Sequence, residues 1–218
     1  MMKFIDFWFD PISPYAYLAF ERMPELLQGV SYSVRYRPVL FGALLKHWSH
    51  KGPAEIEPKR AWTYRQVLWI AHRHGIEMQM PAQHPFNPLG LLRLLHACAG
   101  PPAGMPNRDA CRTVLHHVWH GGADAADPDR LAALTAELAP RLDPSSDAVK
   151  QALRDTTTHA IETGLFGVPT LTVDGHAFWG LDALEMVAGF LRGDPWFDAG
   201  GGWDQAGAPR PGLQRRPG

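Results

Sequence analysis

The feature that most constrains the fold is a nearly continuous apolar run, Phe4–Phe9, which leads into a helix started by a proline. Such a run is typical of a strand covered on both faces in an α/β sheet. Asp10-Pro11 then turns the chain. Pro14 suits the first position of a helix, because its φ angle is fixed there and its missing N–H would have no partner anyway. Ser13 is therefore expected at the N-cap, beside free backbone N–H groups and the positive end of the helix dipole.

The next part of the chain predicts a second strand and then a long helical segment. Residues Tyr32–Val39 alternate between apolar and polar side chains with period two, which indicates a strand. From about residue 42 to residue 164 strand patterns are absent, and readable helix starts follow one another instead. The expected starts are Pro58, Asn87-Pro88, Asn107, Asp127-Pro128 and Ser146, and the expected ends lie near Gly75, Gly100, Gly121 and Gly164.

The sheet pattern returns at Phe166–Val173, turns at Asp174-Gly175 and continues through His176–Trp179, because Asp-Gly between two short apolar runs favours a hairpin. Asp182 is expected to open a last helix. From Ala199 onward Gly, Pro, Gln and Arg leave almost nothing to bury, which predicts disorder. The predicted units are a discontinuous domain of residues 1–41 and 165–198, a helical insertion of residues 42–164, and a disordered tail of residues 199–218.

The composition limits the classes of partner. With 218 residues, 45% of them hydrophobic and 20% charged, the chain can build one or two domains with real cores. A formal net charge of −1 without Lys/Arg blocks argues against nucleic acid or a membrane surface as the main partner, so we expect a small ligand. No apolar run approaches the roughly 18 residues that span a bilayer, and no secretion signal is visible, so we expect a cytoplasmic protein. The two cysteines, Cys98 and Cys111, indicate neither a disulfide framework nor a zinc site.

The order of these elements, together with several short motifs, resembles the 2-hydroxychromene-2-carboxylate isomerases and the related kappa-class glutathione transferases of the wider DsbA-like group. The motifs are Phe9–Tyr15, Pro58-Lys59-Arg60, Pro85–Pro88, and Phe166–Thr170 with Phe178–Asp182. The resemblance covers about residues 3–192 and implies an α/β protein with a thioredoxin-like fold and a large all-helical insertion. A homodimer is common in the family, and we expect one here.

The start of the first helix distinguishes this chain from disulfide oxidoreductases of the same fold. Those proteins carry Cys-Pro-x-Cys there, whereas this chain reads Ser13-Pro14-Tyr15-Ala16. Without the two sulfurs, dithiol exchange at this position is chemically impossible. Ser13 could simply cap the helix. The resemblance implies instead that its hydroxyl donates to the thiolate of a bound glutathione, which the positive end of the helix also favours.

The same resemblance assigns the other candidate residues. A cis bond at Val168-Pro169 would turn the backbone of Val168 toward Ser13, where it would pair with glutathione like one rung of a sheet. Asp182 would receive the γ-glutamyl ammonium group, or else only cap the last helix. The polar residue and the arginine that usually flank this acid are replaced by Leu181 and Ala183.

Charged and polar residues of the insertion complete the candidate site. Lys59 would meet a carboxylate of glutathione, with a solvated surface charge as the alternative. The residues implied to contact the substrate are Lys46, Asn87 and Tyr15; for Asn87 a helix cap is the alternative. His116 and His120 share one helix face, but no third ligand is evident, so no metal is expected.

The resemblance implies a cis–trans isomerase for an aromatic 2-hydroxychromene-2-carboxylate or a related compound, with glutathione as a reusable nucleophile. Two alternatives stay open. One is a kappa-like glutathione transferase or peroxidase, which consumes glutathione. The other is a non-catalytic protein that binds glutathione or a peptide.

Overall fold

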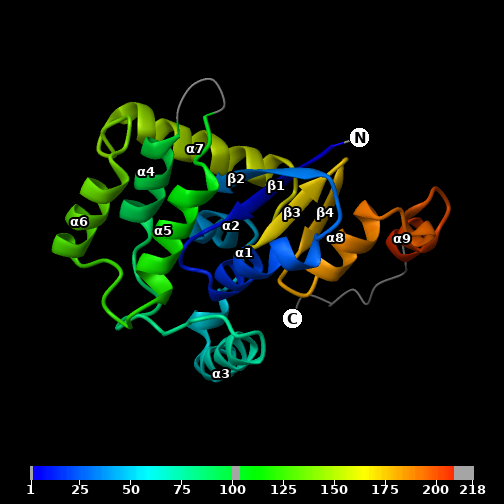
Figure 1. The fold of residues 1–218 in the computed structure, drawn as a ribbon, viewed down its shortest axis with the longest axis horizontal. Helices are drawn as coiled ribbons and strands as arrows, with labels where there is room; N and C mark the ends of the chain where they lie inside the picture. Colours follow the sequence, from blue (N-terminus) through cyan, green and yellow to red (C-terminus); the bar gives the residue numbers. More distant parts are fainter. Residues whose placement is uncertain (1, 100–103, 209–218) are drawn as a thin grey trace, which may run out of the picture.

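A computed structural model of the chain describes residues 2–99 and 104–208. Four strands form one sheet in the order β2-β1-β3-β4 (Figure 1). The strands are β1 (Lys3–Phe9), β2 (Tyr32–Pro38), β3 (Thr170–Val173) and β4 (His176–Trp179). Central β1 runs parallel to β2 and antiparallel to β3, and β4 completes an antiparallel hairpin with β3.

The helices that the described residues form lie mostly between β2 and β3, which confirms the α/β class with a long helical segment. They are α1 (Pro14–Leu26), α2 (Phe41–His47), α3 (Glu57–Arg73), α4 (Leu89–Cys98), α5 (Arg108–Trp119), α6 (Pro128–Leu138), α7 (Asp147–Glu162), α8 (Leu184–Leu191) and α9 (Gly202–Gly207). In Figure 1, α4, α5 and α6 lie at one end of the molecule and α8 and α9 at the other, with the sheet between them.

Side chains of β1 enter two apolar layers, as expected for a strand that is covered on both faces. Phe7 and Phe9 belong to the larger layer, which also contains buried residues of α1, α5 and α8. Trp8 belongs to a smaller layer with residues of α2 and α7. Because fully burying a large apolar side chain contributes about 1.5–3 kcal/mol, these layers fix the sheet between the helices.

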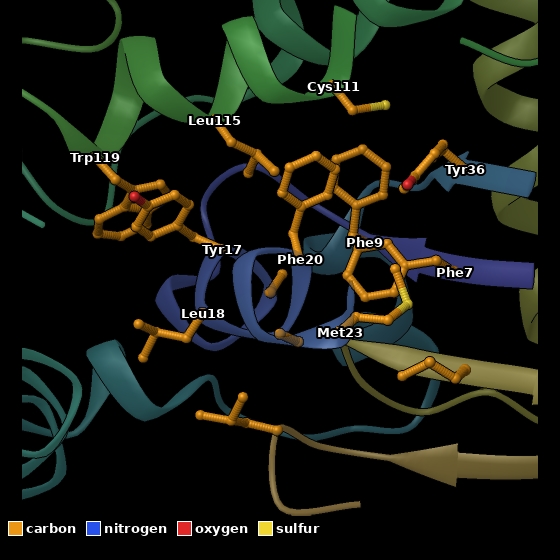
Figure 2. Close-up of a cluster of buried hydrophobic side chains, with 14 of the residues drawn as sticks. Phe7, Phe9, Tyr17, Leu18, Phe20, Met23, Tyr36, Cys111, Leu115 and Trp119 are labelled. Atoms are coloured by element: carbon orange, nitrogen blue, oxygen red, sulfur yellow. The ribbon is translucent and has the colours of Figure 1, made fainter. Parts of the chain in front are cut away.

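The larger layer also joins α1 to the helical segment. Tyr17 and Phe20 of α1 face Leu115 and Trp119 of α5 (Figure 2). The rings of Tyr17 and Trp119 are stacked, with centroids 6.3 Å apart and planes 14° from parallel. The helix that begins at Ser13 is therefore packed directly against α5.

Three predicted helix starts are confirmed by side-chain caps. Asn107 accepts a hydrogen bond from the N–H of Ala110 at 2.8 Å. Asp127 accepts one from Arg130 at 2.9 Å, and Ser146 accepts one from Val149 at 3.4 Å. Such caps typically contribute about 1 kcal/mol each, which explains why these starts are readable in the sequence.

Two predicted boundaries near the C-terminal half are wrong. β3 begins at Thr170 rather than Phe166, because Pro169 has no N–H to donate to a ladder. The last helix begins at Leu184 with Ala183 at its N-cap, so Asp182 does not cap it. Asp182 therefore lies in the turn before α8, where its carboxylate is exposed.

The prediction of a disordered tail is wrong for residues 199–208, which include α9. Trp203 packs against His176, Phe178 and Phe197, with ring centroids 5.2, 5.4 and 5.7 Å away. A single tryptophan in a Gly-rich stretch thus supplies the apolar surface that the composition alone did not indicate.

Residues 209–218 and the predicted helix end at Gly100 lie outside the described residues. The domain boundaries at residues 41/42 and 164/165 stay predictions.

In the two stretches that the structure describes, no helix is both long enough and apolar enough to cross a membrane.

Candidate functional site

Ser13 caps α1, as expected, and lies opposite the loop before β3. Its Oγ accepts a hydrogen bond from the N–H of Ala16 at 3.2 Å, and its hydroxyl donates to the carbonyl oxygen of Val168 at 3.4 Å. The residue is 6% exposed. The Val168-Pro169 bond is cis, which confirms that prediction. The structure therefore brings together Ser13, Val168 and Pro169, although their roles stay predictions.

A buried carboxyl group supports the turn before Ser13. Asp10 is fully buried, and its two carboxyl oxygens accept hydrogen bonds from the N–H groups of Ile12 at 3.0 Å and Phe41 at 2.9 Å. Burial raises the pKa of Asp10 from 3.8 to about 7, and the two N–H groups offset part of that rise. The carbonyl oxygen of Asp10 accepts from the N–H of Ser13 at 2.9 Å. Asp10 thus ties the Ser13 turn to the start of α2.

Two side chains from the helical segment hold the carbonyl groups of the same turn. Trp119 Nε1 donates to the carbonyl oxygen of Pro11 at 3.1 Å. His84 Nε2 lies 2.8 Å from the carbonyl oxygen of Ile12. Sequence reasoning missed both contacts and the role of Asp10. His84 immediately precedes the Pro85–Pro88 motif, but no local signal pairs it with Ile12.

Tyr15 and Asp182 lie near each other beside Ser13. The hydroxyl of Tyr15 donates to Gln66 of α3 at 2.6 Å. Burial raises the pKa of Tyr15; a hydrogen bond with Thr63 counteracts this, and the negative charge of Asp182 adds to the rise. Asp182 therefore acts on Tyr15 through its charge, and its assignment to the ammonium group of glutathione stays a prediction.

Gly180 allows the Asp182 turn to reach the cis-proline. Its φ angle of +100° lies in the region that side chains rarely adopt, and an added Cβ would come within 2.5 Å of Asp182 Oδ1. The N–H of Gly180 donates to the carbonyl oxygen of Pro169 at 2.9 Å. Only glycine fits here without displacing the Asp182 carboxylate.

Two aromatic rings form an exposed edge next to Val168. Phe166 is 43% exposed and Trp179 is 54% exposed, and their centroids lie 4.9 Å apart. The indole of Trp179 covers the backbone of Gly167 so closely that an added Cβ would lie 2.4 Å from its Nε1. The apolar edge and the candidate backbone pairing at Val168 therefore belong to one surface.

The structure does not join the remaining candidates to Ser13. Lys46, in the last turn of α2, and Lys59, in the first turn of α3, are exposed. Neither lysine forms a hydrogen bond or ion pair with another described residue, so both assignments stay predictions. Asn87 Oδ1 accepts from the N–H of Leu89 at 3.1 Å. The N-cap of α4 is nevertheless Pro88, so Asn87 does not cap the helix in the way its position suggested, and its contact with substrate stays a prediction.

The two histidines at i and i+4 on α5 contact α1 and its surroundings instead of a metal-like set of ligands. His116 Nε2 lies 3.1 Å from Glu21 Oε1, and His120 Nε2 lies 2.8 Å from the hydroxyl of Tyr17. They border a hollow of about 290 Å³ that is lined by Tyr17, Glu21 and Glu77 among others. Across residues 2–99 and 104–208, no group of three or more His, Cys, Asp or Glu side chains is arranged to hold a metal ion.

The fold and the site together define a class of protein. A four-stranded sheet of this topology, with a helix capped at the position opposite a cis-proline, is a thioredoxin-type arrangement. A serine occupies the position where oxidoreductases of this class place a cysteine.

The chain belongs to the DSBA-like thioredoxin domain family, whose family model matches residues 4–192. It is 28% identical over 199 residues to 2-hydroxychromene-2-carboxylate isomerase of Sphingobium xenophagum. The matched region covers 88% of this chain and 99% of that protein. It is 26% identical over 206 residues to glutathione S-transferase kappa 2 of Caenorhabditis elegans, covering 87% of this chain and 92% of that protein.

A solved structure of 2-hydroxychromene-2-carboxylate isomerase has the same fold. Its TM-score to this chain is 0.74 at 23% sequence identity, over 87% of this chain and 94% of that one. The predicted thioredoxin-like fold with a helical insertion is thereby confirmed.

Proposed function

We propose that the protein is a glutathione-dependent cis–trans isomerase of 2-hydroxychromene-2-carboxylate or a related aromatic compound. The observation that carries the proposal is the Ser13 hydroxyl at the N-terminus of α1, facing the backbone of Val168 next to a cis-proline. The relative from Sphingobium xenophagum is named for this isomerisation, and the relative from Caenorhabditis elegans is named as a glutathione transferase.

The residues around Ser13 fit the thiol and backbone of glutathione. Ser13 is nearly buried, and its proton points to a long, 3.4 Å contact with Val168, so the hydroxyl can turn toward a sulfur atom at small loss. Among the hydrogen bonds of the described residues, none uses the N–H of Val168, although Val168 is buried. A peptide-like ligand would give this N–H a partner, as strand pairing does. Asp182 is exposed nearby and can receive an ammonium group.

When bound, glutathione supplies a nucleophilic thiolate that adds to the conjugated substrate and is released unchanged after rotation about the former double bond. The Ser13 hydroxyl donates a hydrogen bond to the position of the sulfur atom, and the N-terminus of α1 contributes positive potential there. Together they lower the pKa of the bound thiol below its free value near 8.5, each pKa unit being worth about 1.4 kcal/mol. Lys46, Lys59, Asn87 and Tyr15 are proposed to meet the carboxylates and the aromatic substrate.

Ser13→Ala tests the proposal. We expect turnover of 2-hydroxychromene-2-carboxylate to fall by about 10²–10³-fold, the effect of removing one hydrogen-bond donor from a developing or stabilised anion. The pKa of bound glutathione, followed by the ultraviolet absorbance of the thiolate, should rise. Ser146→Ala is the matched control, because it removes the cap of α7 and lowers stability similarly without touching Ser13. Unchanged turnover and thiol pKa in Ser13→Ala would mean that Ser13 is only a cap.

The second candidate function is a kappa-like glutathione transferase or peroxidase, which the kappa-class relative favours. The two activities differ in their use of glutathione. An isomerase leaves the total glutathione constant over many turnovers, whereas a transferase consumes one molecule per product. Stoichiometric loss of glutathione would therefore exclude the isomerase.

A non-catalytic glutathione-binding or peptide-binding protein is the remaining alternative, supported by Leu181 and Ala183 beside Asp182. Retained binding of glutathione without turnover of any tested substrate would favour it.

We further propose a cytoplasmic homodimer. Light scattering during gel filtration should give twice the chain mass of 24.2 kDa, and cell fractionation tests the location.

A further inference from the structure

The peptide unit that precedes Ser13 is held at both of its ends. Its carbonyl group belongs to Ile12 and lies 2.8 Å from His84 Nε2. Its N–H belongs to Ser13 and donates to the carbonyl oxygen of Asp10 at 2.9 Å. Because a peptide unit is planar, rotating it would break both contacts together. The orientation of Ser13 therefore depends on His84 as well as on the local turn.

The direction of the His84 contact fixes the position of its ring proton. A carbonyl oxygen can only accept, so Nε2 must carry hydrogen. Burial lowers the pKa of His84, although its bond to Ile12 works in the opposite direction, so the ring is neutral at neutral pH. In the neutral ring Nδ1 is then an acceptor.

Tyr64 of α3 supplies the group that this acceptor needs. Its hydroxyl lies 2.8 Å from His84 Nδ1 and 2.8 Å from the backbone oxygen of His84. The single hydroxyl proton is shared between these two acceptors, and its donation toward Nδ1 favours the tautomer with hydrogen on Nε2. The His84 ring also contacts the rings of Trp119 and Phe86, with centroids 5.7 and 6.1 Å away. Hydrogen bonding and packing thus hold one orientation of this imidazole.

We propose that His84, oriented by Tyr64, is a positioning residue that sets the direction of the Ser13 hydroxyl through the Ile12 carbonyl. The inference rests on the proposed function, since it gives His84 a task only if Ser13 meets a sulfur atom. It gives the helical insertion a part in orienting Ser13 at the start of the first helix. Pro14 strengthens the effect, because a residue before proline has few backbone conformations, and Ser13 takes an extended one with φ −87° and ψ 114°.

The test compares two substitutions that each replace the imidazole with a polar amide but place that amide at different distances from the backbone. The amide nitrogen of His84→Gln falls near the position of Nε2 and can still donate to Ile12. The amide of His84→Asn falls near Nδ1 and cannot reach it. His117→Asn is the control, because His117 is also half-buried in the insertion and its Nε2 lies 3.1 Å from a backbone oxygen, that of Ala125.

We expect His84→Asn to lower turnover by about ten- to a hundredfold, as displacing a reacting group by about 1 Å does, with KM for substrate nearly unchanged. The pKa of bound glutathione should rise, as in Ser13→Ala. His84→Gln should recover most of the turnover, and His117→Asn should keep it. Tyr64→Phe, which removes only the hydroxyl, should lower turnover severalfold.

The outcomes separate this inference from the proposed function. If Ser13→Ala is impaired while His84→Asn is not, or if His84→Gln is as impaired as His84→Asn at equal melting temperature, His84 does not position Ser13 and the proposed function stands. Wild-type turnover in Tyr64→Phe would remove Tyr64 from the pair. If Ser13→Ala itself is active and binds glutathione with an unchanged thiol pKa, the proposed function fails.

Discussion

Replacing Asp10 with asparagine should change how the stability of the protein depends on pH. Burial raises the pKa of Asp10 from 3.8 to about 7 in the folded protein. Between these values the folded chain keeps a proton on Asp10 that the unfolded chain has lost. The stability that this group contributes is therefore fully present below pH 3.8 and is lost as pH rises to about 7.

The magnitude follows from the difference between the two pKa values. A rise from 3.8 to about 7 corresponds to about 4 kcal/mol. An amide does not titrate, so the free energy of unfolding of Asp10→Asn, minus that of the wild type, should increase by about 4 kcal/mol between about pH 4 and pH 7.5. The amide also leaves the N–H of Ile12 or Phe41 facing a donor, which costs about 1–3 kcal/mol at every pH and does not alter the slope.

Urea unfolding at several pH values, followed by tryptophan fluorescence, measures this difference. Asp143→Asn is the control. Hydrogen bonds from Ser145 hold the pKa of Asp143 below 3.8, so its stability contribution is lost only as pH falls below that range. The corresponding difference should be flat above about pH 5. A flat difference for Asp10→Asn as well would refute the reasoning, because the carboxyl group would then titrate alike in the folded and unfolded chains.

Two further predictions concern packing. In Gly167→Ala the new Cβ would lie 2.4 Å from Trp179 Nε1, so the indole must move off the backbone. We expect a shift in tryptophan emission and, in calorimetry, weaker binding of glutathione. Unchanged emission would contradict the packing described. Trp203→Ala removes the ring that packs on His176 and Phe178. It should lower the free energy of unfolding by about 2 kcal/mol and increase amide hydrogen exchange in α9. Trp203→Phe should recover most of the lost stability.

The sequence predicts the features that depend on neighbouring residues. Asn107, Asp127 and Ser146 each bond to an N–H three residues ahead, so the start of each helix is encoded locally. The apolar run Phe4–Phe9 predicts a strand covered on both faces for the same reason, because this pattern is visible in neighbouring residues. Trp203 shows the limit of this reasoning, since two of its partners, His176 and Phe178, lie in β4, on the far side of α8 in the sequence.

The candidate site divides in the same way. The position of Ser13 follows from Pro14, which immediately follows it, and the cis bond before Pro169 follows from the family motif. The contacts of His84 and Trp119 with the Ser13 turn could not be predicted, because nothing within several residues of either one indicates a distant carbonyl group. Hydrogen-bond partners across a fold depend on how helices pack, which local sequence patterns do not reveal.

The partners of the Ser13 turn lie far along the chain. Ile12 and His84 are 72 residues apart, Pro11 and Trp119 are 108 apart, and Ser13 and Val168 are 155 apart. During synthesis the serine leaves the ribosome long before the last of these residues is made. A nascent or truncated chain that ends before β3 therefore carries the complete Phe9–Tyr15 motif without a working site. A gene fragment recognised by that motif alone should yield an inactive product.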